Sequence, residues 1–215
     1  MSTFFTEYAW LIPLFPFAAF IILTGMGKSL GKAGAWIATV ASFVSLVLAV
    51  CLATERMSGN APEYSKQFEW ISIGKLKLMA GFEVTNLSTL MLVVVTLVAF
   101  LVNLYSQGYM KKDERISTFY AYVALFTSSM LGLVLADNLL TFYIFWELVG
   151  VCSFLLVGFW YRKPEAKAAA KKAFIVTRIG DLGLLIAILL LFWYMPGNAL
   201  DFTAIHNVFD TQGGV

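Results

Sequence analysis

Six long apolar runs dominate the sequence and constrain its fold more than any other feature. A helix rises about 1.5 Å per residue, so ~20 apolar residues cross the ~30 Å hydrocarbon layer of a bilayer. A helix also satisfies its own backbone hydrogen bonds, which lipid cannot do. We therefore predict an all-α, polytopic transmembrane bundle of about six helices. The predicted spans are residues 9–26, 34–54, 84–107, 117–136, 139–161 and 173–195.

The composition agrees with a membrane protein and narrows its chemistry. The chain is 60% hydrophobic and 13% charged, whereas soluble domains have about 45–50% apolar and about 25% charged residues. A net charge of +2 gives no reason to expect nucleic acid as a partner. The single histidine cannot pair with another to hold a haem, and both cysteines lie inside apolar runs. We expect no metal site and no cofactor.

The basic residues predict how the bundle is oriented. Ten of the 15 Lys and Arg residues fall in alternate loops on one side, four lie on the other side, and one lies within the last span. Cytoplasmic loops carry the excess of Lys and Arg, so the N-terminus is predicted to be outside. The ten residues are Lys28, Lys32, Lys111, Lys112, Arg115, Arg162, Lys163, Lys167, Lys171 and Lys172.

The connections outside the spans carry further predictions. Residues 55–83 form an external loop in which WISIGKLKLM alternates around Gly74, a pattern typical of a short amphipathic hairpin. Only Asp137 and Asn138 separate the fourth and fifth spans, so these must be antiparallel neighbours, with either residue available as the N-cap. Residues 196–215 are predicted to be an external loop with an amphipathic segment starting near Asp201. The loop-like end of the chain suggests a fragment of a longer protein.

Three charged residues lie inside the predicted spans, and such residues are functional candidates by default. Glu147 lies near the middle of residues 139–161. Its helical stripe contains small residues that let another helix approach, so the acid is predicted to face protein. Arg178 and Asp181 are three residues apart on the last span and can pair within that helix.

Two interpretations of these charges remain open. In the first, they only hold helices together, which Arg178 and Asp181 could do by pairing with each other. In the second, Glu147 binds and releases a proton as a cation approaches and leaves, as carboxylates do in pumps. Glu147 has no cation at the neighbouring positions of its own helix, so Arg178 or a residue elsewhere must supply it. Counting from the predicted helix ends places Glu147 and Asp181 about one to two turns apart in depth.

Several stretches resemble one family of membrane proteins closely. The chain is similar over all six spans to the distal, antiporter-like subunit of the respiratory complex I membrane arm, the subunit-5 or NuoL type. The stretches that carry the resemblance are NLYSQGYM (103–110), FYAYVALFTSSMLGLVLADN (119–138), VLADNLLTFY (134–143), FYIFWELVGVCSFLLVGFW (142–160) and AAAKKAFIVTRIGDLGLL (168–185).

This resemblance implies a function and a site. Glu147 would be the glutamate of a proton channel, and Arg178 and Asp181 the charged pair that modulates it. In the family the glutamate works with a lysine on a broken seventh helix, which this chain does not contain. The redox chemistry of NADH:quinone oxidoreductase would belong to other subunits. The alternatives are an Mrp-type cation/proton antiporter module and a non-transporting membrane fragment.

The implied partners and location follow from the same resemblance. We expect the chain to contact other complex I membrane-arm subunits and the lipid bilayer, and to carry protons or sodium ions. The expected location is the bacterial plasma membrane or an equivalent energy-transducing membrane.

Overall fold

The computed structural model describes residues 4–31, 33–59, 63–73, 76–195 and 198–212. It contains eight helices and one β-hairpin within these residues. The helices are α1 (Phe4–Glu7), α2 (Leu11–Leu30), α3 (Ala33–Ser58), α4 (Asn86–Tyr109), α5 (Ile116–Val134), α6 (Leu139–Val157), α7 (Pro164–Tyr194) and α8 (Phe202–Gln212). The strands are β1 (Tyr64–Ile73) and β2 (Leu76–Val84).

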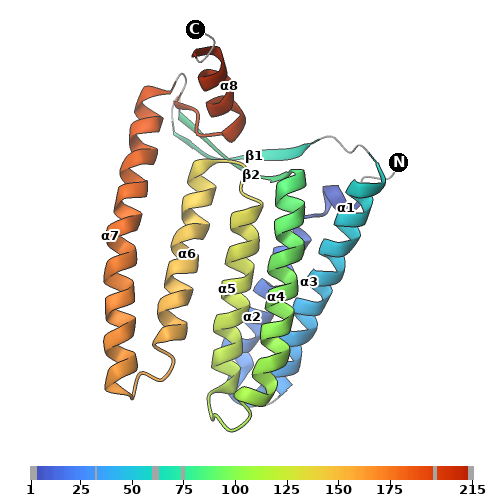
Figure 1. The fold of residues 1–215 in the computed structure, drawn as a ribbon, viewed down its shortest axis with the longest axis vertical. Helices are drawn as coiled ribbons and strands as arrows, with labels where there is room; N and C mark the ends of the chain where they lie inside the picture. Colours follow the sequence, from blue (N-terminus) through green and yellow to red (C-terminus); the bar gives the residue numbers. More distant parts are fainter. Residues whose placement is uncertain (1–3, 32, 60–62, 74–75, 196–197, 213–215) are drawn as a thin grey trace.

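The predicted helical membrane bundle is confirmed. In the described part of the chain, α3 to α7 are each long and apolar enough to cross a membrane, and α2 contains a shorter apolar helix, Leu11–Gly27. Helices α2 to α5 pack together, α6 packs on α5, and α7 packs on α6 as the outermost helix (Figure 1). The protein is thus an integral membrane protein of about six spans.

Two serine side chains link α3 and α5 to the backbone of α2 near a proline that interrupts its hydrogen bonds. Pro16 lies inside α2 and has no N–H to give to the carbonyl oxygen of Ile12. Ser45 of α3, fully buried, donates its hydroxyl to that oxygen at 2.8 Å. The hydroxyl of Ser128 in α5 donates to the next carbonyl, that of Pro13, at 3.0 Å. Ser45 therefore replaces the helical donor that Pro16 cannot supply to Ile12, and Ser128 adds a second hydrogen bond from a neighbouring helix to the backbone of α2.

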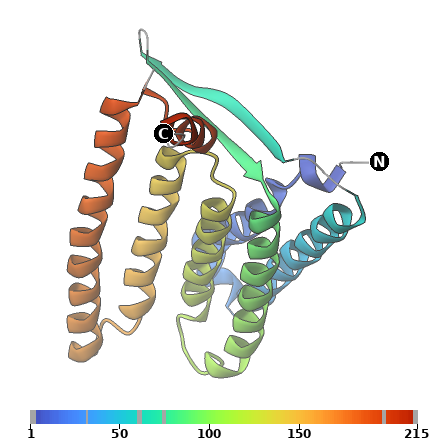
Figure 2. The same ribbon diagram turned by 45° about the horizontal axis from the view of Figure 1, so that its top comes forward.

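The hairpin lies across one end of the bundle, beside α8 (Figures 1 and 2). Its strands pair antiparallel, with a register shift between Glu69 and Ile71. It is attached to the α5–α6 connection because Glu83 N donates to Leu135 O at 2.9 Å and Asn138 Nδ2 donates to Met79 O at 3.0 Å. The predicted hairpin is confirmed and is longer than its sequence pattern indicated; its centre, Gly74, lies outside the described residues.

Helix α6 begins where the sequence predicted, and α7 extends beyond its predicted apolar span. Asn138 is the N-cap of α6, as one of the two predicted candidates, because its side chain accepts a hydrogen bond from Thr141 N. The predicted last span, residues 173–195, is the apolar part of a longer helix, because α7 begins at Pro164 and has 31 residues. Ala and Lys favour helices, so the basic segment before residue 173 continues the helix beyond its apolar part.

The tail matches its prediction in type. The helix α8 begins at Phe202, one residue after the predicted start. The backbones of Asp201 and Asn138 form an isolated antiparallel β-bridge, and Phe202 N donates to Asp137 O at 3.4 Å. The segment before α8 therefore packs against the α5–α6 connection, which also contacts the hairpin.

Candidate functional site

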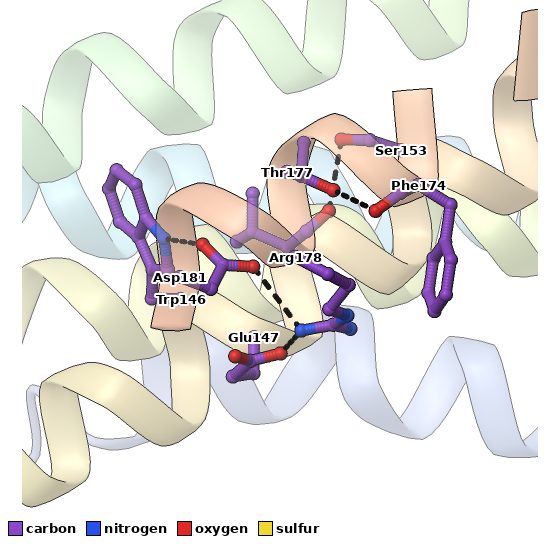
Figure 3. A network of polar contacts seen from close by, with 8 residues as sticks. Trp146, Glu147, Ser153, Phe174, Thr177, Arg178 and Asp181 are labelled. Carbon is purple, nitrogen blue, oxygen red and sulfur yellow. Dashed lines mark hydrogen bonds and ion pairs between the residues drawn. The ribbon is translucent and has the colours of Figure 1, made fainter. Parts of the chain in front are cut away.

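The three predicted site residues meet at the packed face of α6 and α7 (Figure 3). Arg178 Nη1 forms an ion pair with Glu147 Oε2 across the two helices. The same nitrogen lies 3.3 Å from Asp181 Oδ2 on its own helix. Arg178 therefore contacts both acids at once, and it is the cation that Glu147 lacks on its own helix.

The predicted orientation of Glu147 towards another helix is confirmed by its ion pair with Arg178 and by three residues on the same side of α6: Gly150, Phe154 and Gly158. A Cβ added to Gly150 would lie 4.0 Å from Asp181 Oδ2, and one added to Gly158 would lie 3.2 Å from Ala170 Cβ. Between them, the rings of Phe154 and Phe174 approach to 5.2 Å between centroids. Small residues let α7 approach α6 closely at these points, so the acid faces protein.

The predicted depth difference between Glu147 and Asp181 is wrong. Both acids contact one guanidinium group, so they lie at the same level of the bundle. The error came from the helix ends: α6 ends at Val157 rather than near 161, and α7 begins at Pro164. Counted from Pro164, Asp181 lies about 26 Å along α7, whereas a helix start at residue 173 would place it only about 12 Å along.

Trp146 is a site residue that the sequence reasoning missed. Its indole Nε1 donates a hydrogen bond of 2.8 Å to Asp181 Oδ1 (Figure 3). A tryptophan N–H in an apolar environment needs an acceptor, and Trp146 directly precedes the intramembrane acid. That combination is the signal that could have identified it. Phe174 also contributes, because its ring centroid lies 5.0 Å from Arg178 Cζ, within the range of a cation–π contact.

A cleft of about 680 Å³ adjoins these residues between α6 and α7. Asp181 and Trp146 line it with the hydroxyl residues Ser153 and Thr177. The cleft is large enough for several waters, each of which needs roughly 30 Å³. Thr177 and Asp181 thus lie on the same face of α7. The site therefore combines two acids, a shared cation and a cavity that can admit water.

A second acidic group lies outside the spans, under the hairpin. Asp137 is 3% exposed, its Oδ1 accepts from Asn138 Nδ2 at 2.8 Å, and its Oδ2 has no hydrogen-bond partner among the described residues. Burial raises the pKa of Asp137 and outweighs nearby donors from the backbone and from Gln67, which lower it; the negative charge of Asp201 raises it further. Burial also raises the pKa of Glu83, with smaller contributions from Glu63 and Asp137. Within the described residues, no group of three His, Cys, Asp or Glu side chains is placed to hold a metal ion.

Two family models match the chain. One is described as "NADH:quinone oxidoreductase/Mrp antiporter, TM" and matches residues 136–214, which include the whole site. The other is described as "NADH-Ubiquinone oxidoreductase (complex I), chain 5 N-terminus" and matches residues 70–120.

Curated relatives agree with both models. The chain is 45% identical over 201 residues to the chloroplastic NAD(P)H-quinone oxidoreductase subunit 5 of Mesostigma viride, covering 90% of this chain and 30% of that protein. It is 44% identical over 206 residues to NAD(P)H-quinone oxidoreductase chain 5 of Synechocystis sp., covering 93% and 30%. The chain thus spans about 30% of the length of the curated relatives it matches.

Solved structures share the fold. The Mrp complex of Dietzia sp. DQ12-45-1b matches with a TM-score of 0.69 and 24% identity, covering 86% of this chain and 19% of that chain. The membrane-bound sulfane sulfur reductase, an archaeal respiratory membrane complex, matches with a TM-score of 0.74 and 17% identity, covering 91% and 38%.

The helical bundle with its charged site and the two family models together place the chain in the class of antiporter-like membrane subunits. Within that class, the chain belongs to the family of NAD(P)H-quinone oxidoreductase subunit 5 and corresponds to the N-terminal part of that subunit.

Proposed function

We propose that this chain carries protons as part of a proton-translocating NAD(P)H:quinone oxidoreductase. The observation that supports this proposal is that Arg178 lies between Glu147 and Asp181, which come from two different helices. A cation shared by two acids can shift towards either one with a small movement. The acid that it leaves then favours its protonated form, because an unpaired carboxylate in a low-dielectric interior is costly.

In this proposal Glu147 is the carboxyl group that switches. When Arg178 lies close to Glu147, the carboxylate is neutralised and holds no proton. When Arg178 shifts towards Asp181, Glu147 takes up a proton, and the return of the cation releases it. We place water in the cleft beside Asp181, where the hydroxyl groups of Ser153 and Thr177 can hold it, as the route by which the proton reaches the site.

The proposed partners and orientation follow from the relatives and the charges. The relatives are named as subunits of NAD(P)H-quinone oxidoreductase, so we place this chain among the other membrane subunits of such a complex, with electron transfer in the rest of the assembly. The proposed location is an energy-transducing membrane with the N-terminus and the hairpin outside. Labelling of Gln67→Cys and Lys112→Cys variants with a membrane-impermeant maleimide tests this: Gln67→Cys should react from outside and Lys112→Cys should not.

The decisive experiment on function is Glu147→Gln in the intact complex. The substitution keeps size and hydrogen bonding but removes proton exchange. We expect proton pumping and coupled turnover to fall at least tenfold, while assembly and electron transfer to an artificial acceptor persist. Glu165→Gln is the matched control, because Glu165 lies in the exposed first turn of α7. Normal pumping by Glu147→Gln would contradict the proposal.

A second candidate is a cation/proton antiporter module. It is favoured by the description of the family model over residues 136–214, which names the Mrp antiporter together with the oxidoreductase. The two functions differ in what drives transport. Sodium-dependent proton flux in vesicles without any electron donor would support the antiporter, and flux that requires electron transfer would support the oxidoreductase subunit.

A further inference from the structure

A pocket of about 340 Å³ lies between α3 and α4, at the end of the bundle opposite the hairpin (Figure 1). Its volume is within the range of small-molecule sites, about 300–1,000 Å³. The pocket shares no lining residue with the cleft beside Asp181. The described residues that line it come from the start of α3, the end of α4 and the connection to α5: Ala35, Trp36, Gln107, Gly108, Lys111 and Ile116.

Lys111 gives the pocket a positive charge. It is exposed, and its ammonium group carries three hydrogen-bond donors. The acid nearest to it in the sequence, Asp113, has both oxygens engaged by other donors. Its Oδ1 accepts from Arg115 N at 2.8 Å, and its Oδ2 accepts from Trp160 Nε1 at 3.0 Å. Lys111 is therefore suited to bind an anion that enters the pocket.

Gln107 adds a neutral donor whose orientation is fixed by its neighbours. The hydroxyl of Thr39 donates to Ala35 O at 2.8 Å, so the hydroxyl oxygen accepts the hydrogen bond of 2.9 Å from Gln107 Nε2. An amide nitrogen carries two hydrogens, so the second can donate to a ligand in the pocket. A charged donor beside a neutral one suits a phosphate group, whose several oxygens all accept hydrogen bonds.

Apolar surface continues from the pocket along α3. Trp36 lines the pocket and is 63% exposed. Val40, Phe43 and Val47 follow at three- to four-residue spacing on the same face of the helix, and all are exposed. Tryptophan is enriched at the level of the lipid headgroups. The stripe beyond Trp36 thus lies at the depth of the acyl chains.

We propose that this pocket binds the headgroup of an anionic phospholipid, with the phosphate at Lys111 and Gln107 and an acyl chain along the stripe from Trp36 to Val47. Basic pockets between transmembrane helices suit such headgroups. The stripe distinguishes a lipid from free phosphate, because an inorganic ion makes no use of apolar surface. The inference requires no proton transfer and does not depend on the proposed function.

The test is photolabelling of the intact complex in phosphatidylcholine vesicles. The vesicles contain a trace of phosphatidylglycerol or of phosphatidylcholine, each with a diazirine at the same acyl position, and mass spectrometry maps the label. We expect the phosphatidylglycerol probe to label the stripe from Trp36 to Val47 about threefold to fivefold more than the phosphatidylcholine probe. Unlabelled phosphatidylglycerol should compete, and inorganic phosphate at matched ionic strength should not.

Two variants separate charge from shape. Lys111→Gln should remove most of the preference for the anionic probe. Lys112→Gln is its matched control, because Lys112 is also exposed but lies outside the described lining, and it should keep the preference. Gly108→Leu fills the pocket without changing its charge, and a Cβ at Gly108 meets no atom within 4 Å. It should lower labelling of the stripe by the anionic probe.

Several results would overturn the inference. Equal labelling of the wild-type complex by the two probes would do so, and this comparison needs no variant. A stripe without label means that another part of the complex covers the pocket. Competition by inorganic phosphate identifies a site for the free ion. An equal loss of preference in Lys111→Gln and Lys112→Gln indicates general surface charge. None of these results bears on proton pumping by Glu147→Gln, which tests the proposed function separately.

Discussion

The close approach of α5 and α6 at Gly132 gives a prediction whose size follows from the structure. A Cβ at this buried position would lie 2.5 and 2.7 Å from two ring atoms of Phe145 and closer still to a third. Ordinary carbon contacts are about 3.5–4.0 Å, so Gly132→Ala must displace the ring or the helix by on the order of 1 Å. Overpacking of this kind costs about 1–3 kcal/mol. Phe145 lies on the turn that carries Trp146 and Glu147, so we expect lower stability and disturbed pumping together.

The measurement is the thermal unfolding midpoint of the detergent-solubilised protein, with proton pumping measured in parallel. Gly183→Ala is the control, because a Cβ at Gly183 meets no atom within 4 Å, and it should leave the midpoint unchanged or raise it through better helix propensity. Phe145→Leu should relieve the clash, so the double variant should be more stable than Gly132→Ala alone. A Gly132→Ala protein with wild-type stability, or one that Phe145→Leu does not improve, would refute the packing argument.

Two further predictions concern stability and use the same unfolding measurement. Ser45→Ala should destabilise the protein by about 1–2 kcal/mol, because it leaves the buried Ile12 carbonyl without its donor. Thr127→Val should cost less, since the Thr127 hydroxyl donates to the carbonyl of Val123 on its own helix. The raised pKa of Asp137 means that the folded state holds this proton more tightly than the unfolded state. The contribution of Asp137 to stability is therefore greatest below the ordinary carboxyl pKa and is lost as pH rises through the folded pKa. Asp137→Asn keeps the oxygen that accepts from Asn138 and removes the carboxyl group that ionises. The variant should therefore be more stable than the wild type at neutral pH, and its stability should depend less on pH. An unchanged dependence of stability on pH would contradict the role given to Asp137.

The fold was predictable where a pattern has a single physical cause. Apolar runs of bilayer length predicted the helices, and alternation around Gly74 predicted the hairpin. The two-residue connection at Asp137 and Asn138 predicted antiparallel neighbours and the N-cap. The small residues on the stripe of Glu147 predicted that it faces another helix, which is α7.

The remaining features depend on helix ends and on contacts between helices. Hydropathy marks where a helix is apolar and not where it begins, so the start of α7 at Pro164 was missed and the relative depths of Glu147 and Asp181 were wrong. Which cation Glu147 binds was left open between Arg178 and a residue elsewhere, because pairing across helices depends on their rotation and offset. The bond from Trp146 to Asp181 was missed for the same reason. Contacts between two helices therefore become visible only in the three-dimensional structure.

The central claim is that the carboxyl group of Glu147 binds and releases a proton during turnover. Infrared difference spectroscopy of the intact complex measures this directly, because a protonated carboxyl group has a C=O stretching band that a carboxylate lacks. The account predicts a protonated-carboxyl band that appears when electron transfer is driven, disappears in Glu147→Gln and remains in Glu165→Gln. A band that persists unchanged in Glu147→Gln would contradict the account.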